Sequence, residues 1–556
     1  MIPTNLLRAL AFALIAATLA PLSASAPQPS PIAHIATGAV RGSMQGSIAV
    51  FKGIPFAAPP VGDLRWKPPA PPAPWKGERD ATQPGSACMQ SPGGLGPFMK
   101  PIAAAYGANY EIRPITSSED CLYLNVWVPQ QPANAPMPVM VWLHGGSNTA
   151  GSGAQPTYDA TSLASRGVVV VTVNYRLGVF GFFSHPALTA ESPHHSSGNY
   201  GLLDQLAALQ WVQDNIAQFG GDRGNVTVFG ESAGSIDAAV LVTSPLAAHL
   251  FRRAILESGP PFGLGPAQSL TEAEDAGNAL AASIPQAAAT PLESLRKLPA
   301  ADLMRLVTDR GSNSGSITVD GWVIPRPPAL AFASGATVKA DLIVGLNGRE
   351  LSAFRLMAAA APRQPVKPAA GGNASVGKAA DTLRPLYGDW TYAAISKYLV
   401  EALVDRDGAT DHGSNDMLMA CPIGALAALV GASGQKAYVY RFDRSVPGKG
   451  QPVLGAFHGL EIPYVFNAFQ ERSWSWLPFT DADRQLSQVI ETYWTNFART
   501  GDPNGAGVPV WGAWKDGSED YMEFSPQASA SAQTGFSPPF CYLSPDRVRK
   551  GLAGAH

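Results

Sequence analysis

The segment Asn225-Val-Thr-Val-Phe-Gly-Glu-Ser-Ala-Gly234 carries the strongest structural signal in this 556-residue chain. Its first half is a short apolar run, which is typical of a buried strand, and residues 233–242 continue as an apolar helix. Between the two lies a Gly-x-Ser-x-Gly pentapeptide. Its glycines clear space for a sharp strand-to-helix turn that holds the hydroxyl of Ser232 outside the sheet. This context favours a nucleophilic serine over an idle serine in a glycine-rich turn.

Upstream of this segment, strands and a helix alternate. Residues 138–143 and 167–174 are continuous apolar runs, as expected for strands that are buried on both faces of a parallel sheet. Between 204 and 219, apolar residues recur at spacings of three and four, which indicates an amphipathic helix. The order β, β, α, β, α predicts an α/β fold, with a central, mostly parallel, twisted sheet and helices on both faces.

The composition excludes several classes of protein. Lysine and arginine number 39, aspartate and glutamate number 42, and no basic block could neutralise a row of phosphates. We therefore expect no nucleic-acid partner. No Cys-x-x-Cys pair suggests a zinc site, and we expect neither a metal nor another cofactor. The sequence indicates no particular oligomeric state.

The first 26 residues have the order of a secretory signal. Arg8 precedes an apolar run, 9–20, and the small residues Ala24-Ser25-Ala26 follow it. The run is shorter than the roughly 20 residues that a membrane-spanning helix needs, so a membrane anchor is the weaker alternative. We expect a secreted or periplasmic protein without a stable membrane span.

The chain has four cysteines, Cys88, Cys121, Cys421 and Cys541. An even number of cysteines in an exported protein favours two disulfides. The sequence alone allows three pairings and also the alternative of buried free thiols.

A serine hydroxyl is barely ionised at neutral pH, so Ser232 needs a base. Four histidines follow it in the chain. His556 lies on the C-terminal tail, and His249 follows the helix after Ser232 too closely to fold back onto it. His412 lies in a polar run that suggests a solvated loop. His458 lies in a small-residue loop before an apolar segment, and it is the predicted base.

The base in turn needs an acid that orients it. Residues 340–345 form a late apolar strand, and the loop after it contains Glu350. Asp341 is a rival, but it opens the strand instead of following its carboxyl end. Glu350 could also be a surface carboxylate paired with Arg349, so the residues alone leave these alternatives open.

The reaction of a serine with a carbonyl group also needs donors for the oxyanion that develops. One should be the backbone N–H of Ala233, next to the nucleophile. The others would come from the turn His144-Gly145-Gly146-Ser147, whose glycines let the backbone approach a substrate closely. The alternative is a simple strand-ending turn.

Together, these features resemble the type-B carboxylesterases, which are relatives of the cholinesterases. The resemblance extends from about residue 37 to about residue 545. It rests on the motifs Phe51-Lys-Gly-Ile-Pro-Phe56 with Pro59-Pro60, Leu64-Arg65-Trp66, Ser118-Glu-Asp-Cys-Leu-Tyr-Leu-Asn125, Gly198-Asn-Tyr-Gly-Leu-Leu-Asp-Gln205, Phe219-Gly-Gly-Asp222 and Val228-Phe-Gly-Glu-Ser-Ala-Gly234. It implies that residues 27–556 form a single α/β-hydrolase domain with large loop and helical insertions, preceded by a signal peptide, 1–26.

The resemblance also assigns roles to residues. It implies a triad in which Ser232 is the nucleophile, Glu350 the acid and His458 the base. The other implied positions are Gly146, Ser147 and Ala233 in the oxyanion hole, Gly145, Glu231 and Ser258 in support of the site, the disulfides Cys88–Cys121 and Cys421–Cys541, and a salt bridge between Arg65 and Glu119.

The activity that this resemblance implies is hydrolysis of small carboxylic esters by water, through an acyl-enzyme intermediate. An acyltransferase or an amidase would use the same triad. A non-catalytic binding relative would keep the fold and lose the nucleophile, whereas Ser232 is present.

Three departures from the family pattern concern the site. Ser147 stands where a third glycine is usual, and the acid loop has Arg349 and Leu351 around Glu350 where aspartate and glycine are usual. The segment between Cys88 and Cys121 contains no tryptophan that could hold a quaternary ammonium by cation–π attraction. Choline esters are therefore not expected substrates.

Overall fold

The computed structural model describes residues 30–130, 135–262, 267–283, 291–311, 313–360, 398, 401–538 and 541. The expected signal peptide, 1–26, and His556 lie outside these residues.

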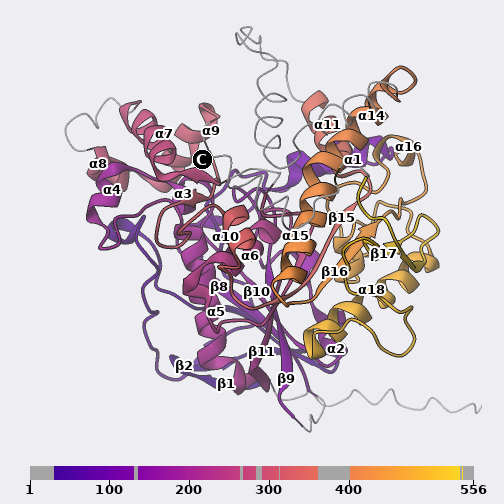
Figure 1. Ribbon diagram of the computed structural model, residues 1–556. Helices are drawn as coiled ribbons and strands as arrows, with labels where there is room; N and C mark the ends of the chain where they lie inside the picture. Colours follow the sequence, from indigo (N-terminus) through magenta and orange to yellow (C-terminus); the bar gives the residue numbers. More distant parts are fainter. Residues whose placement is uncertain are drawn as a thin grey trace, which may run out of the picture.

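An 11-stranded mixed sheet runs through the centre of the molecule (Figure 1). Its middle seven strands are parallel, and antiparallel strands extend both edges. In sheet order the strands are β18 (Ala530–Gln533), β17 (Tyr521–Phe524), β16 (Ala437–Phe442), β15 (Asp341–Asn347), β12 (Arg253–Glu257), β11 (Gly221–Glu231), β9 (Met137–Leu143), β10 (Val169–Val173), β8 (Tyr123–Pro129), β4 (Ile48–Pro55) and β3 (Ser43–Gln45). The predicted mostly parallel sheet is confirmed.

Both faces of this sheet are buried, which explains its continuous apolar runs. In β9, Val139, Val141 and Leu143 belong to one hydrophobic core. Met140 and Trp142, which alternate with them, belong to a second core on the other face. Because successive side chains of a strand point to opposite faces, a strand covered on both sides needs apolar residues at every position.

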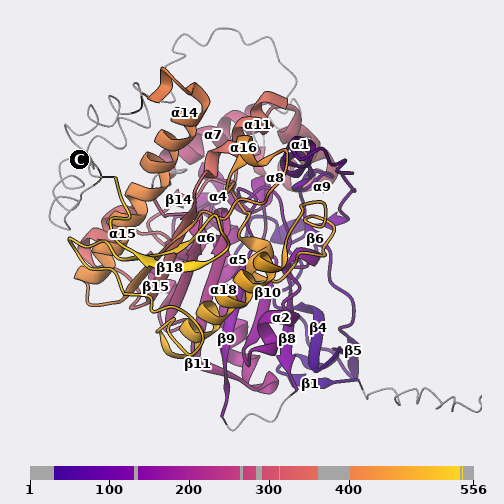
Figure 2. The same ribbon diagram turned by 90° about the vertical axis from the view of Figure 1, so that its right-hand side faces the viewer.

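Helices cover the two faces of the sheet. The first core lies under α5 (Tyr200–Asn215), α6 (Ala233–Thr243) and α15 (Cys421–Ala432). The second lies under α2 (Thr161–Ser165) and α18 (Asp481–Thr500), and Figure 2 shows α18 crossing in front of the sheet.

Insertion helices gather at one end of the sheet, at the top of Figure 1. Those nearest the predicted site are α1 (Gly96–Ala105), α11 (Glu350–Ala360) and α14 (Arg406–Asn415). The other helices are α3 (Gly178–Phe182), α4 (Pro186–Glu191), α7 (Leu270–Ala282), α8 (Pro291–Lys297), α9 (Ala300–Asp309), α10 (Pro328–Ser334), α16 (Gln451–Leu454) and α17 (Ile462–Val465). Small sheets join β1 (Ile32–Ile35), β2 (Gly38–Arg41) and β5 (Glu78–Asp80), β6 (Ala87–Cys88) and β7 (Ser117–Ser118), and β13 (Gln268–Ser269) and β14 (Thr318–Val319).

The helix predicted over 204–219 begins earlier, at Tyr200, and its last turn is a 3₁₀ helix, Ile216–Phe219. A Cβ at Gly201 would lie 2.7 Å from the ring of Phe182, so glycine permits close packing of α5 against α3. Gly220, at a φ of 73°, ends the 3₁₀ turn in the left-handed conformation that glycine favours.

One helical stretch, Arg406–Ala432, is long and apolar enough to cross a membrane by length and composition, but 72% of its apolar window is buried inside the protein. It is therefore a core helix of this fold. It also carries Cys421, which forms a disulfide with Cys541, and the second disulfide joins Cys88 to Cys121. The structure thus contains both disulfides that the family resemblance implies.

Candidate active site

Ser232 lies at the sharp turn between β11 and α6, with a φ of 56°. Its N–H donates to the carbonyl oxygen of Glu257 at the end of the neighbouring strand, at 2.9 Å. A Cβ at Gly230 would lie 2.6 Å from the backbone of Gly234, so the turn closes only with glycine at 230. The pentapeptide therefore adopts the strained strand-to-helix geometry predicted for it.

His458 and Glu350 form a buried pair, although 108 residues separate them in the chain. Nδ1–H of His458 donates to Oε2 of Glu350 at 2.6 Å. The other carboxylate oxygen of Glu350 accepts from the N–H of Asn347 at 2.6 Å, and the N–H of Glu350 itself donates to Oδ1 of Asn415 at 3.0 Å. These bonds fix the carboxylate and, through it, the orientation of the imidazole.

The other ring nitrogen of His458 faces a second carboxylate. Nε2 lies 3.2 Å from Oε1 of Glu231, the residue directly before Ser232. Neither atom has a hydrogen-bond partner in the described part of the chain, and this includes the hydroxyl of Ser232. The structure therefore brings Glu350, His458 and Glu231 together, but no hydrogen bond joins Ser232 to His458. Catalytic hydrogen bonds of this kind often tighten only when a substrate binds.

Electrostatics at this cluster favour a protonated imidazole. Burial alone would lower the pKa of His458, but the charges of Glu231 and Glu350 outweigh that effect and raise its pKa to about 9. Burial also raises the pKa of Glu231 and of Glu461, the two nearby carboxyls. The positive charge of an imidazolium is thus stabilised from both of its ring nitrogens.

Ser258 contacts Glu461. Its hydroxyl donates to Oε1 of that carboxylate at 2.9 Å and makes no hydrogen bond to Glu350. Asn347 then links the two carboxylates, because its backbone N–H bonds Glu350 and its side-chain amide bonds Glu461. Ser258 therefore supports Glu350 only indirectly, through Glu461 and Asn347.

The turn after β9 lies against the nucleophile. A Cβ at Gly145 would lie 3.1 Å from Cβ of Ser232 and 2.6 Å from the carboxylate of Glu231, so only glycine fits there. Gly146 and Ser147 follow with φ values of 109° and 55°. The N–H groups of Gly146, Ser147 and Ala233 donate to no other described residue, so they are available to a ligand.

Ser147 adopts the left-handed conformation that its usual glycine counterpart would adopt easily. Its side chain is exposed, and a non-glycine residue at this φ carries strain. Serine at this position therefore holds, with some strain, a backbone conformation that glycine adopts freely.

Apolar side chains form a wall beside the imidazole. The rings of Phe98 on α1 and Phe354 on α11 lie 6.3 Å and 5.0 Å from the ring of His458, and 5.3 Å from each other. Leu95, just before α1, reaches the turn after β9, since a Cβ at Gly146 would lie 3.2 Å from it. The space near the base is thus bordered by apolar groups.

The acid loop is held by ion pairs that the sequence analysis did not predict. The guanidinium of Arg349 pairs with Asp411 on α14 at 2.7 Å, and the backbone N–H of Arg349 donates to the carbonyl oxygen of Ala456, two residues before His458. Arg355 also pairs with Asp411, at 3.0 Å. Arg349 is therefore not a surface partner of Glu350, and it ties the acid loop to the histidine loop.

The rival residues lie elsewhere. Asp341 begins β15 and accepts from the N–H of Lys436 at 2.8 Å. His249 is exposed in a turn. His412 lies within α14 and not in the expected solvated loop, and its Nδ1–H donates to Glu401 at 2.5 Å. Among the described residues, no cluster of His, Cys, Asp or Glu could hold a metal ion.

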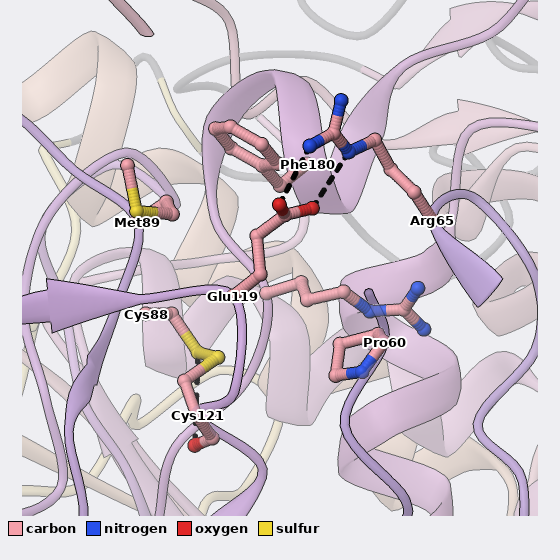
Figure 3. A pocket seen from close by; sticks show the side chains of 8 residues that line it. Pro60, Arg65, Cys88, Met89, Glu119, Cys121 and Phe180 are labelled. Carbon is pink, nitrogen blue, oxygen red and sulfur yellow. Dashed lines mark hydrogen bonds and ion pairs between the residues drawn. A yellow bond between two sulfur atoms is a disulfide. The ribbon is translucent and has the colours of Figure 1, made fainter. Parts of the chain in front are cut away.

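The segment between Cys88 and Cys121 is anchored at a small pocket away from the triad. Figure 3 shows both carboxylate oxygens of Glu119 facing the guanidinium of Arg65, with the disulfide nearby. Both of these hydrogen bonds measure 2.6 Å. The volume of the pocket is about 10 Å³, roughly the space that one water molecule needs. The implied salt bridge is present, and the pocket is too small for a substrate.

Comparisons with known proteins identify the family of the chain. The carboxylesterase family model matches residues 29–539. The fumonisin B1 esterase of Sphingopyxis macrogoltabida is 37% identical over 538 residues, which cover 94% of this chain and 92% of that protein. Carboxylesterase 1C of Mus musculus is 34% identical over 520 residues, covering 89% of each chain.

Solved structures show the same architecture. A PNB esterase structure superposes with a TM-score of 0.73 at 31% sequence identity, covering 91% of this chain and 97% of that one. The sheet, the elbow at Ser232 and the match over nearly the whole chain lead to one conclusion. The chain belongs to the carboxylesterase family and is a carboxylic-ester hydrolase with the α/β-hydrolase fold.

Proposed function

We propose that this esterase acts through a Ser232–His458–Glu350 triad and an acyl-enzyme intermediate. His458 takes the proton of Ser232 through Nε2 while the serine oxygen attacks the ester carbonyl. Glu350 holds the imidazole through Nδ1 and stabilises its charged form. The proton then passes to the leaving alcohol, and a water molecule activated by His458 releases the acid.

The contact of 2.6 Å between Nδ1 of His458 and Oε2 of Glu350 carries this proposal. A buried imidazole held by a carboxylate is the arrangement that a general base requires. Nε2 is left without a hydrogen bond, 3.2 Å from the residue that precedes Ser232. The nitrogen that must receive the proton faces the carboxylate of Glu231, beside Ser232, and it can act as a base once it has lost its own proton.

The oxyanion of the tetrahedral intermediate would be held by the N–H groups of Gly146, Ser147 and Ala233. They belong to the turn after β9 and the start of α6, and the two segments meet at Ser232. Backbone donors that are fixed before the reaction begins stabilise the developing charge without reorganising.

We propose an ester with an apolar group next to the scissile bond as the substrate. Phe98 and Phe354 border the base, and Leu95 borders the oxyanion turn. The fumonisin B1 esterase among the relatives makes fumonisin B1 a substrate to include in a test panel. Choline esters are expected to be poor substrates.

The decisive experiment replaces the nucleophile. Ser232→Ala should lower the hydrolysis of p-nitrophenyl esters by several orders of magnitude, because the triad residues act as a unit. Labelling with an organophosphate should modify the wild type at residue 232 and leave the variant unmodified. Activity retained within tenfold of wild type would refute the triad. Product analysis with added alcohols or amines separates a hydrolase from an acyltransferase.

We further propose that residues 1–26 direct export and that residues 27–556 form one catalytic domain. Two disulfides fit an oxidising compartment. Expression of the full chain in a host with a periplasm, followed by N-terminal sequencing of the mature protein, tests this directly. An N-terminus at Met1, with activity confined to the cytoplasm, would refute export.

A further inference from the structure

A carboxylate that the proposed mechanism does not use lies behind the oxyanion turn. Asp237 is on α6, five residues after Ser232, and is fully buried. Its Oδ1 accepts from the side-chain amide of Asn148 at 2.9 Å, and its Oδ2 accepts from that of Gln205 at 2.5 Å. No cationic side chain pairs with it among the residues that the structure describes.

Asn148 directly follows Ser147 and is the far end of the oxyanion turn. Its φ is 55°, so two successive residues of the turn are in the left-handed region. Its Nδ2 donates to Asp237, and its Oδ1 lies 3.1 Å from the hydroxyl of Tyr175. That hydroxyl has one hydrogen, which it shares between this oxygen and the closer carbonyl oxygen of His144, at 2.6 Å. Both ends of the turn are thus bound to the same buried network.

Asparagine at 148 depends on Asp237 for one of its contacts. The side-chain amide of Asn148 has Asp237 as its closest acceptor, and among the described residues the only other is the carbonyl oxygen of Gly315 at 3.4 Å. Without the carboxylate, a buried amide would lose its main acceptor at a place where the backbone is already strained.

The carboxylate is costly for the fold. Burial raises the pKa of Asp237 to about 7, and the hydrogen bonds from Asn148 and Gln205 only partly offset that effect. An ionisable group buried without a cation destabilises a protein unless its hydrogen bonds compensate. Its presence one turn after Ser232 is best explained by its hydrogen bond to Asn148 in the turn after β9.

We propose that Asp237 is a positioning residue, which fixes the oxyanion turn through Asn148 so that the N–H groups of Gly146 and Ser147 point at the substrate oxygen. This inference rests on the oxyanion hole proposed above. Because α6 also begins at Ala233, this one helix would position Ser232 and the oxyanion donor of Ala233, and through Asp237 it would also position the donors of Gly146 and Ser147.

The test compares two substitutions at one position. Asp237→Leu has a similar size but leaves the amide of Asn148 without its acceptor. Asp237→Asn keeps an acceptor for Asn148, and Gln205, whose Oε1 has no partner, can turn its amide to meet the new donor. Ser244→Ala is the matched control, because it removes a buried hydrogen bond at the other end of the same helix.

We expect Asp237→Leu to lower kcat by at least about tenfold with KM changed less than about threefold, since loss of a whole oxyanion donor typically costs more than this. The inhibition constant of an alkyl trifluoromethyl ketone, which forms an oxyanion on the serine, should rise in parallel. Asp237→Asn and Ser244→Ala should remain within about threefold of wild type in kcat.

Asn148→Gly gives a second route if Asp237→Leu does not fold. Glycine accepts the left-handed backbone at 148 and removes only the side chain, so we expect the same loss in kcat and in ketone binding. Unchanged kcat and ketone affinity in Asn148→Gly or in folded Asp237→Leu would overturn the role of Asp237. Inactivity of Ser232→Ala in the same assay would still support the triad assignment. Failure of the Asp237 proposal can thus be told apart from failure of the proposed function.

Discussion

Oε1 of Glu231 lies 3.2 Å from Nε2 of His458, the ring nitrogen that Glu350 does not contact. The predicted base is therefore flanked by carboxylates at both nitrogens. One of these carboxylates, that of Glu231, belongs to the residue directly before Ser232. The protonation of His458 therefore depends on a side chain of the strand that leads to Ser232.

We expect Glu231→Gln to lower the apparent pKa of the acidic limb of the kcat/KM profile. A carboxylate at Nε2 favours imidazolium and raises the pKa of His458, so its removal lets the base lose its proton at lower pH. Rates measured between about pH 5 and 10 with a p-nitrophenyl ester test this. Glu293→Gln, at an exposed position, is the control, and an unchanged or higher pKa in Glu231→Gln would contradict the assignment.

Glu350→Gln should lower kcat by roughly 10³ to 10⁴, because the imidazole loses the group that orients it and stabilises its charge. Asp341→Asn is the matched comparison, since Asp341 was the rival acid and lies at the opposite end of β15. It should keep kcat within about twofold, as surface substitutions away from a site usually do. Equal losses in the two variants would leave the acid unassigned.

Ser147 offers a test of the turn itself. Ser147→Gly should keep the activity and slightly raise the melting temperature, because glycine adopts a φ of 55° without strain. Ser147→Val should lower kcat by about tenfold or more, since a β-branched residue is poorly tolerated at this φ. Steady-state kinetics and thermal melts decide this, and equal kcat in both variants would mean that the turn is not set by residue 147.

Disulfide loss should separate stability from activity. Replacing Cys88 and Cys121 by serine should destabilise the fold by roughly 4 kcal/mol in the chain-entropy model and should raise KM, because their segment carries Leu95 and Phe98 to the site. Replacement of Cys421 and Cys541 by serine is the control. It should lower the melting temperature and leave KM unchanged. A KM that stays constant in both double variants would show that α1 does not border the substrate.

Asp237→Asn should change stability in a pH-dependent way. The pKa of Asp237 is raised to about 7 in the folded state, above its ordinary value of 3.8, so the folded protein resists ionisation there. The loss of folding stability caused by burying this carboxyl group therefore grows as pH rises from about 4 to about 7. Tyr175, whose pKa Asp237 helps to raise, stays neutral throughout. The free energy of unfolding of the variant, minus that of the wild type, should therefore be more favourable at pH 8 than at pH 4, as measured by urea unfolding. A difference that does not change with pH would contradict the burial of an ionised carboxylate.

The parts of the site that the sequence predicted depend on local patterns. The elbow needs glycine on both sides of Ser232, and a parallel strand with two buried faces needs an unbroken apolar run. Both requirements are visible within ten residues. The choice of His458 as the base stays a prediction, and among the described residues its Nδ1 lies 2.6 Å from Oε2 of Glu350.

The parts that were missed depend on contacts between distant segments. Asp411 and Asn415 lie in a polar run that suggests solvent exposure, yet they are 1% and 2% exposed. They are polar because they satisfy Arg349 and the N–H of Glu350 inside the protein. The route from Ser258 to Glu350 through Glu461 and Asn347 was likewise not predicted, since nothing local shows that Glu461 lies between them.

The closed segment 88–121 has a practical consequence. Its two ends are held with their Cα atoms 4.9 Å apart by the disulfide, and Arg65 clamps Glu119 just inside that closure. Between these anchors lie Leu95 and Phe98, which border the site, so substitutions there are a route to redirect the enzyme toward bulkier or smaller esters. The bonds of Gln90 to Gly151 and of Tyr106 to Val446 tie the same segment to the rest of the fold, so libraries should keep those two residues.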